Sequence, residues 1–270
     1  MNHHCTFIFY KVIQNTKMPV KVVQNIKQKN NGVPLKILVA LTSILGFLMV
    51  VLPGPLYQYA GVGLGTAFTS LRYGVYVGGA ALILIVLQVI INRKNISWGS
   101  TIVYAVLALI AVAMPVSMMS KASTVPPIHD ITTDVTNPPE FVAIAPLREG
   151  APNDVNYEGG DITKQQLEAY PEIKTQLLPQ PVSEVYVAAE KAIATLGWDN
   201  VTAGALPNTL EATDTTTWFG FKDDVVIRLT EKGDNTLVDV RSKSRVGKSD
   251  LGKNAERINA FMAELRKQLG

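Results

Sequence analysis

Three long apolar stretches separated by short polar segments dominate the first part of the chain. They cover residues 35–56, 73–91 and 101–119. Each is close to the roughly 20 residues that an α-helix needs to cross a bilayer core about 30 Å thick. A signal peptide would account for the first stretch at most, because the other two are as long and lie deeper in the chain. The pattern therefore predicts a region of three transmembrane helices over residues 35–121.

Shorter periods take over in the C-terminal part. Apolar residues at spacings of three and four predict a helix over residues 182–196, with Gly197 as its C-terminal stop. Alternation of apolar and polar residues predicts strands at 209–216, 225–230 and 237–246, with a fourth near 199–203. A helix, consecutive strands and a closing helix together predict an α+β domain, in which an antiparallel sheet carries helices packed on one face.

Two further helices complete this predicted domain. The closing helix has an apolar stripe formed by Leu251, Ala255, Ile258, Met262, Leu265 and Leu269. Ser249 or Asp250 is expected to cap its N-terminus. A short helix is predicted over residues 163–170, where Thr163 and Gln166 have the spacing of a capping box.

Charge divides the chain at the same place as hydropathy. Residues 1–121 contain ten Lys or Arg and no acid, so all 22 Asp and Glu residues follow Lys121. The two parts therefore carry net charges of +10 and −7, which indicates two different surroundings. Most of the basic excess flanks apolar stretches rather than forming a folded basic face, so we expect no nucleic-acid partner.

The basic residues also predict the orientation of the spans. Lysines crowd the N-terminal segment, residues 1–34, and Arg93 and Lys94 lie between the second and third spans. By the positive-inside rule this segment is cytoplasmic, and an odd number of spans exports the remainder. The expected protein is therefore a multi-pass protein of the bacterial inner membrane. Its periplasmic part has a Pro-rich linker at residues 122–150, which leads into the α+β domain at residues 151–270.

Small and aromatic residues mark the segments around the spans. The connector of residues 53–72 is apolar, contains two tyrosines and is expected to lie along the outer membrane interface. Gly74 and Gly78 have the small-xxx-small spacing of helix packing, either within the chain or between two copies. Pro115 is expected to kink or end the third span.

The predicted sheet carries one candidate binding site. Glu211, Arg228, Asp239 and Arg241 are expected to share the face away from the helices, open to solvent. In one interpretation Arg228, Arg241 and Arg245 converge on a carboxylate, a phosphate or a lipid headgroup, because the planar guanidinium suits such anions. In the other, the charges form a ladder of cross-strand pairs that keeps the sheet soluble.

The turn of residues 245–254 adds two candidates for an anion site. Lys248 and Ser249 lie next to the expected helix N-terminus, where backbone N–H groups attract anions. The turn lacks the GxxxxGK[ST] spacing of a phosphate-binding loop. Capping by Ser249 or Asp250 is the alternative role for this segment.

Nucleophiles and metal ligands are sparse in the sequence. His129 is the only histidine after residue 121, and Cys5 is the only cysteine of the chain. Met18 offers a second translation start, which would leave Cys5 out. Asp130 and Asp134 beside His129 match no metal-ligand spacing, and turn contacts account for them better. We therefore expect no metal and no cofactor, and we assign no catalytic residue.

Four separated motifs carry a resemblance to a known family. They are PPIHDITTDVTNPPEF at 126–141, AYPEIKTQLLPQP at 169–181, FKDDVVIRL at 221–229 and VDVRSKSRVGKSDLGKNAERI at 238–258. Together they resemble the DUF1499 family of bacterial proteins of unknown function, over residues 126–266. The three preceding spans resemble the membrane-anchored members of that family. The resemblance implies a domain class and an envelope location, and it brings no active site.

These observations favour binding over catalysis. The resulting interpretation is a non-enzymatic binding or envelope-maintenance module, anchored in the lipid bilayer, for a small anionic or lipid ligand. One alternative is a periplasmic enzyme acting on a lipid or small anion. Its candidate residues are Arg228, Arg241, Arg245, Asp223, Asp239 and His129. The other alternative is a subunit of a membrane protein assembly, with the three spans as its interface.

Overall fold

The structure is a computed structural model that describes residues 33–202 and 206–270. The predicted basic segment up to residue 32, with Cys5 and Met18, lies outside the described residues. The chain forms two compact units. The helical unit comprises Gly63–Pro115 and the part of Met1–Pro53 that the structure describes. The sheet unit comprises Gly54–Val62 and Val116–Gly270.

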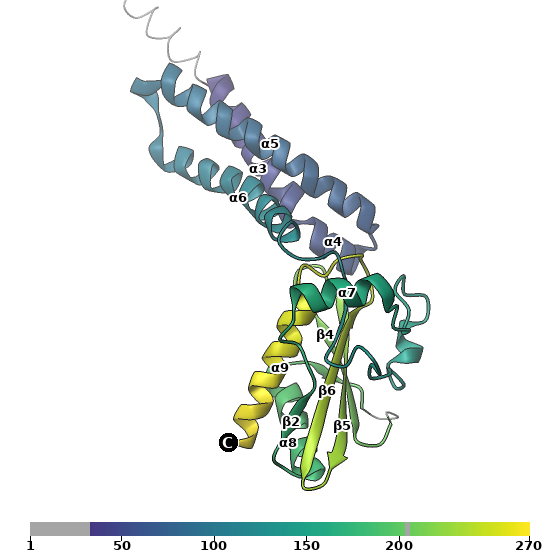
Figure 1. Cartoon of the computed structure of the whole chain (residues 1–270). Coiled ribbons are helices and arrows are strands. Elements are labelled where there is room, and N and C mark those ends of the chain that lie inside the picture. Colours follow the sequence, from purple (N-terminus) through teal and green to yellow (C-terminus); the bar gives the residue numbers. More distant parts are fainter. Residues whose placement is uncertain (1–32, 203–205) are drawn as a thin grey trace, which may run out of the picture. The chain divides into compact units, whose positions relative to one another are not determined.

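The three predicted apolar stretches form long helices, although the first helix ends at Val51 and not at Leu56 as predicted (Figure 1). The helices are α3 (Val33–Val51), α5 (Leu64–Ile91) and α6 (Trp98–Ala122), with the short 3₁₀-helix η1 (Arg93–Asn95) before α6. By length and composition, these three helices of the described chain are able to cross a membrane. The helix of the second predicted span begins earlier than predicted, because residues 64–72, which are part of the predicted connector, are the first turns of α5. Pro115 lies inside α6 and does not end that helix.

Glycines allow the helices of the helical unit to pack closely. A Cβ atom added at Gly74 would lie 2.6 Å from Val50 Cγ2 on α3, and one added at Gly78 would lie 2.8 Å from Ala111 Cβ on α6. Apolar helices in lipid gain little from hydrophobic burial, so close approach and dispersion contacts hold them together. Gly74 and Gly78 therefore serve packing within the chain.

We predict that Gly78→Ala destabilises the helical unit by about 1–3 kcal/mol, because the added methyl group overlaps α6. Gly79→Ala is the matched control, since a Cβ atom there would meet nothing within 4 Å. Thermal unfolding of both variants in detergent, followed by circular dichroism, measures the difference. Equal melting curves for the two variants would contradict this packing.

The sheet unit is built on an antiparallel sheet. Its strands among the described residues are β1 (Asp130–Thr132), β2 (Gln176–Leu178), β3 (Asp199–Asn200), β4 (Thr209–Thr215), β5 (Lys222–Lys232) and β6 (Asn235–Ser244). Their order is β1-β6-β5-β4-β3, and β2 also pairs with β6. The helices of this unit are α4 (Pro53–Ala60), η2 (Ala145–Arg148), α7 (Gly160–Ala169), α8 (Val182–Leu196) and α9 (Lys253–Leu269). This arrangement confirms the predicted α+β class.

One face of the sheet forms the apolar core with α8 and α9. Leu210, Ile227 and Val240 stand side by side on neighbouring strands and are fully buried. Ile193 of α8 and Phe261 of α9 belong to the same cluster. Each such buried side chain contributes about 1.5–3 kcal/mol relative to exposure. The predicted bounds of α8 and its Gly197 stop, at φ 73°, are confirmed.

The other face of the sheet is covered by an irregular segment, residues 133–158, which we call the cover. Phe141 and Ile144 of this segment cluster with Val226 of β5. The prediction that this face is open to solvent is therefore wrong. Glu211 and Arg241, which do share the face, are only 0% and 2% exposed. Charges expected to be hydrated thus need partners inside the protein.

Residues 128–132 belong to the domain rather than to a linker. Ile128 and Ile131 are buried in the core, and β1 pairs with β6. The other edge of β1 is closed by Gln166, whose Oε1 accepts from Thr132 N at 3.1 Å and whose Nε2 donates to Thr132 O at 2.6 Å. This use of Gln166 overturns the predicted capping box, and α7 begins earlier, after Gly159.

Candidate functional site

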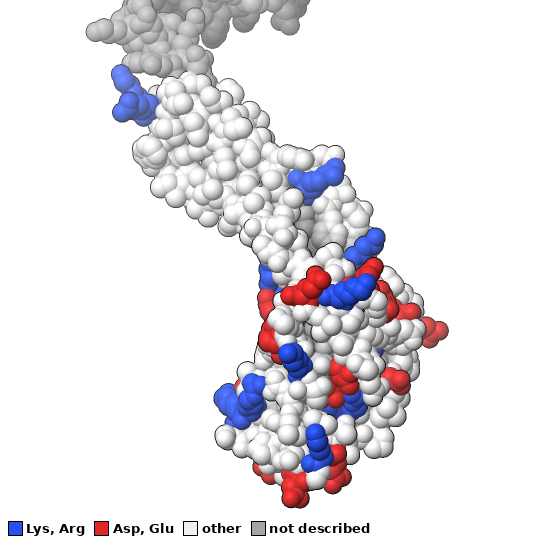
Figure 2. Space-filling view, in the orientation of Figure 1, with Lys and Arg blue, Asp and Glu red and all other residues white. Residues whose placement is uncertain are grey.

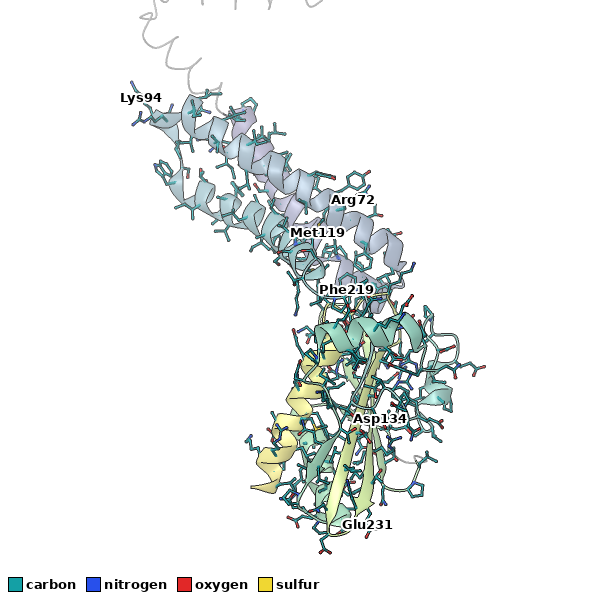
Figure 3. The ribbon with its side chains drawn as sticks, in the orientation of Figure 1. Arg72, Lys94, Met119, Asp134, Phe219 and Glu231 are labelled. Atoms are coloured by element: carbon teal, nitrogen blue, oxygen red, sulfur yellow. The ribbon has the colours of Figure 1, made fainter. Side chains whose placement is uncertain are left out.

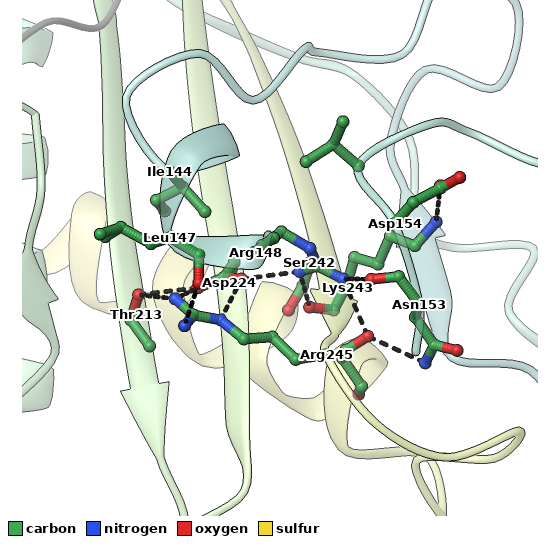
Figure 4. A network of polar contacts seen from close by, with 12 residues as sticks. Ile144, Leu147, Arg148, Asn153, Asp154, Thr213, Asp224, Ser242, Lys243 and Arg245 are labelled. Atoms are coloured by element: carbon green, nitrogen blue, oxygen red, sulfur yellow. Dashed lines mark hydrogen bonds and ion pairs between the residues drawn. The ribbon is translucent and has the colours of Figure 1, made fainter. Parts of the chain in front are cut away.

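Charged side chains gather beneath the cover, at the end of β6 that leads toward α9. We call this group the buried charge network, and Figure 4 shows the part of it that contains Arg148, Asp224, Lys243 and Arg245. Its cations are Arg148, Arg241, Lys243 and Arg245, and its carboxylates are Asp130 and Asp224. Alternation along β6 places Arg241 and Lys243 on one face, and Arg245 follows directly after the strand. Arg148 comes from η2 in the covering segment.

Asp224 binds two arginines at once. Arg245 forms a bidentate pair with it, with Nε–Oδ2 and Nη2–Oδ1 distances of 2.8 Å. Arg148 Nη1 donates to Oδ2 at 2.6 Å, and Thr213 Oγ1 donates to Oδ1 at 2.7 Å. The Asp224 carboxylate is fully buried. Charge-assisted bonds of this kind are the strong ones, so the Arg148 bond fixes η2 to β5 and the bidentate Arg245 pair fixes the end of β6 to β5.

Asp130 holds the other half of the network. Arg241 donates to it from Nε at 2.9 Å and from Nη2 at 2.8 Å, and Lys243 Nζ lies 3.4 Å from Oδ2. The Arg241 guanidinium also lies 5.1 Å from the Phe141 ring and 5.4 Å from the Tyr157 ring. Cation–π contacts with desolvated rings add to the stability of this position.

The four cations of the network meet two buried carboxylates and, through Lys243, the exposed carboxylate of Asp154, and backbone carbonyl groups supply the remaining acceptors. Lys243 Nζ donates to Asn156 O at 2.6 Å, and Arg241 Nη2 donates to Val155 O at 3.0 Å. Arg148 Nη2 donates to Asn153 O at 2.9 Å. Burial lowers the pKa of Lys243 and that of Arg148, although Asp130 and Asp224 act in the opposite direction. Keeping these buried cations charged therefore costs free energy in the folded protein.

Residues 153–158 form a single layer over these cations, which we call the strap. Its inward residues Asn153, Val155 and Tyr157 alternate with exposed Asp154, Asn156 and Glu158. Hydrogen bonds from Asn153 Nδ2 to Ser244 O and Gly247 O, at 3.1 and 2.8 Å, hold one end. Asp154 stands 3.8 Å from Lys243, but its side chain is 67% exposed. Only one layer of chain therefore separates Lys243 from solvent.

Comparison with known families now adds the domain class. The family described as "Protein of unknown function (DUF1499)" matches residues 130–265. This chain belongs to the DUF1499 family. A search of curated proteins finds no match. A crystal structure of CalU16 from Micromonospora echinospora is similar to 35% of this chain and 80% of its own, at 17% identity and a TM-score of 0.25. That likeness is too low to carry a structural argument.

In the DUF1499 domain, the three arginines predicted for the anion site form ion pairs with different carboxylates. Arg228 Nη2 lies 3.1 Å from Asp134 Oδ2 and 2.9 Å from Asp239 Oδ2, away from the network. Arg241 pairs with Asp130 and Arg245 with Asp224. The three arginines that were predicted to converge are therefore separated. Arg228 bridges Asp134 and Asp239 near the middle of β6, whereas Arg241 and Arg245 belong to the network.

Lys248 and Ser249 of the DUF1499 domain lie in the turn before α9. Lys248 is exposed, and Ser249 Oγ accepts from Leu251 N at 3.3 Å. The predicted cap is displaced, because Gly252 is the N-cap residue of α9, at φ 80°. Asp250 nonetheless serves the helix terminus by accepting from Gly252 N and Asn254 N at 2.7 and 2.6 Å. Burial raises the pKa of Asp250 against these bonds.

Two cations of the network, Lys243 and Arg148, are not among the residues predicted for the anion site. Lys243 had a usable signal, since it stands at the alternating position between Arg241 and Arg245. Arg148 had none, because it comes from an irregular segment whose partner Asp224 is far away in sequence. Local periodicity does not report such contacts.

The catalytic candidates of the DUF1499 domain do not converge. Asp223 points to the helix face, where Arg257 Nη2 lies 2.7 Å from its Oδ2, whereas Asp224 points to the covered face. His129 Nε2 lies 3.1 Å from Glu158 Oε1 at the end of the strap. In the part of the chain that the structure describes, no three His, Cys, Asp or Glu residues are placed to hold a metal ion. The chemistry that these side chains can perform is the recognition of negative charge by Arg and Lys.

Proposed function

We propose that this protein is a membrane-anchored binding or envelope-maintenance module, without enzymatic activity, whose DUF1499 domain binds a small anion or the anionic headgroup of a lipid. The observation that carries the proposal is the charge imbalance of the buried network, where four cations face two buried carboxylates and the exposed carboxylate of Asp154. Carbonyl dipoles of the strap occupy the positions that a counter-ion would take. An anion brings the missing charge, which carbonyl groups do not.

The ligand site consists of Lys243, Arg241, Arg148 and Arg245 once the strap moves aside. Phosphate-like anions suit it, because arginine donors bind oxyanions in a bidentate manner and lysine adds a point charge. Arg228 contributes to the same face from its pair with Asp134 and Asp239. Lys248 and Ser249 would take part only if the anion binds at the turn before α9. Comparing the affinities of Lys243→Met and Lys248→Met distinguishes the buried network from the turn.

The proposed location is the bacterial inner membrane, with the N-terminus cytoplasmic and the DUF1499 domain periplasmic. Lys36 Nζ of α3 donates to Asn95 O at 2.9 Å, which brings Lys36, Arg93 and Lys94 to one end of the helical unit. Arg72 lies in the early turns of α5, away from that end (Figure 3). The helical unit bears few other charges in the view of Figure 2. A basic end of this kind supports the positive-inside orientation.

The test is a binding measurement on the full-length protein in detergent. Isothermal titration with inorganic phosphate, and native mass spectrometry with an anionic phospholipid, distinguish a free anion from a lipid headgroup. We expect Lys243→Met to weaken binding by about tenfold or more, since a hydrogen bond to a charged group contributes about 1.5–3 kcal/mol. Arg241 still neutralises Asp130 in this variant, so the fold is preserved.

Lys248→Met is the matched control, because it removes the same charge from an exposed turn. We expect its affinity to stay close to that of the unmodified protein. If Lys248→Met loses binding while Lys243→Met keeps it, the anion binds at the turn before α9. Failure of the unmodified protein to bind phosphate or anionic lipid would overturn the proposed function.

A further inference from the structure

An aromatic turn joins β4 to β5 in the sheet unit. Phe219 of this turn is 3% exposed, and its ring lies 4.7 Å from that of Trp218 and 4.9 Å from that of Phe221. Thr216 closes the turn, since its N–H donates to Phe221 O at 2.9 Å and its carbonyl accepts from Gly220 N at 2.8 Å. These rings lie at one end of β5, and Glu231 lies near the other end (Figure 3).

The turn packs on α4 rather than on the apolar core. The Tyr57 ring lies 5.9 Å from that of Phe219 and 5.6 Å from that of Phe221. Glycines permit this contact: a Cβ atom at Gly54 would lie 2.5 Å from Trp218 O, and one at Gly220 would lie 2.7 Å from Gln58 Cγ. Gly220 also has a φ of +65°, a backbone conformation that glycine adopts without strain. The contact is therefore specific to these positions.

α4 is the short link between two candidate membrane spans. α4 follows α3 and precedes α5, and both of those helices are long and apolar enough to span a membrane. No charged residue occurs between Lys36 and Arg72. Tyr59 is 80% exposed, and Leu56 beside it is exposed as well. Tyrosine and tryptophan next to aliphatic side chains are typical of the boundary between headgroups and acyl chains.

We infer that α4 and the β4–β5 turn, residues 216–221, together form a lipid-binding surface whose partner is the interface of the bilayer. The DUF1499 domain thereby has a second membrane attachment besides its covalent link through α6. Amphipathic surfaces of this type bury about 5–10 Å into the headgroup and acyl boundary. The end of β5 near Phe221 faces the lipid, and the β5–β6 turn faces the aqueous phase. This inference stands independently of the anion site.

Fluorescence quenching in proteoliposomes tests the surface. The chain has one cysteine, Cys5, so a Cys5→Ser background allows single labels at Thr217→Cys and, as the matched control, Asp234→Cys. Both positions are exposed turn residues, at opposite ends of the 11-residue β5, separated by about 35 Å. Each label is read in liposomes containing lipids with a nitroxide near the headgroup, and separately with aqueous iodide.

We expect lipid nitroxide to quench the label at position 217 about threefold more than that at position 234, because only the first lies at the interface. Iodide should quench the label at position 234 more strongly. Equal lipid quenching at both positions would refute the inference. Protection of position 217 from both nitroxide and iodide would refute it too, by showing that a protein, such as a second copy of the chain, covers the turn. A label at Tyr59→Cys provides a second reading of the same surface.

Discussion

Replacing Arg241 with methionine is expected to lower the free energy of unfolding of the DUF1499 domain by about 3–5 kcal/mol, because it leaves a buried carboxylate without its counter-ion. Asp130 is fully buried and receives two hydrogen bonds from Arg241. Lys243 stands 3.4 Å from the same carboxylate but donates its short bond to Asn156 O. Urea denaturation of the full-length protein in detergent, read by pulse proteolysis, measures the loss.

The double variant Asp130→Asn with Arg241→Met is the control for this prediction. Removing both charges eliminates the uncompensated carboxylate, so the double variant should be more stable than Arg241→Met alone. Unfolding of Arg241→Met at the same urea concentration as the unmodified protein would show that Asp130 is hydrated. If such a stable variant also lost anion binding, Arg241 would act in the ligand site rather than in the fold.

Elements with a strong local period were predictable from the sequence. The stripe of α8 and the alternation of β4, β5 and β6 report which side chains face the core, and local spacing alone carries that information. The apolar stretches likewise predict α3, α5 and α6. The start of α5 was not predicted, because the composition of residues 64–72 is compatible both with a helix and with a segment at the membrane interface.

The covered face was not predictable, because its cover has no period. Residues 133–158 are rich in prolines and short turns, a composition that is typical of linkers. β1 has three residues, too few for an alternation to be recognised. The pairs Asp130–Arg241 and Arg148–Asp224 join residues far apart in sequence. The sequence therefore showed charged residues on one sheet face but did not show that the face is buried.

This burial changes what the arginines do. On an open face, cross-strand charge pairs would contribute a few tenths to about 1 kcal/mol each. Under the cover, Arg241 and Arg148 become positions where one substitution removes several hydrogen bonds at once. Under the proposed function, binding and folding would be coupled at this site, since the groups that would meet an anion also hold the cover in place.

Glu211→Ala is expected to destabilise the domain by about 3 kcal/mol, because it leaves one buried and two part-buried N–H groups without their acceptor, and a buried N–H group alone costs about 1–3 kcal/mol. The Glu211 carboxylate accepts three backbone hydrogen bonds, from Val142 and Ala143 to Oε1 at 2.8 and 3.0 Å and from Ile144 to Oε2 at 2.8 Å. One side chain of β4 thus ties the cover to the sheet. Urea denaturation gives the stability, and hydrogen exchange reports on the three amides.

Glu211→Gln is the matched control, because it keeps the size of the side chain and one oxygen acceptor while its amide group brings donors that face other donors. Its loss of stability should be intermediate. In Glu211→Ala the amides of residues 142–144 should exchange much faster, while amides of α8, on the opposite face of the sheet, keep their protection. Unchanged exchange at residues 142–144 would show that the cover is held by its other contacts, of which the Arg148–Asp224 pair is the strongest candidate.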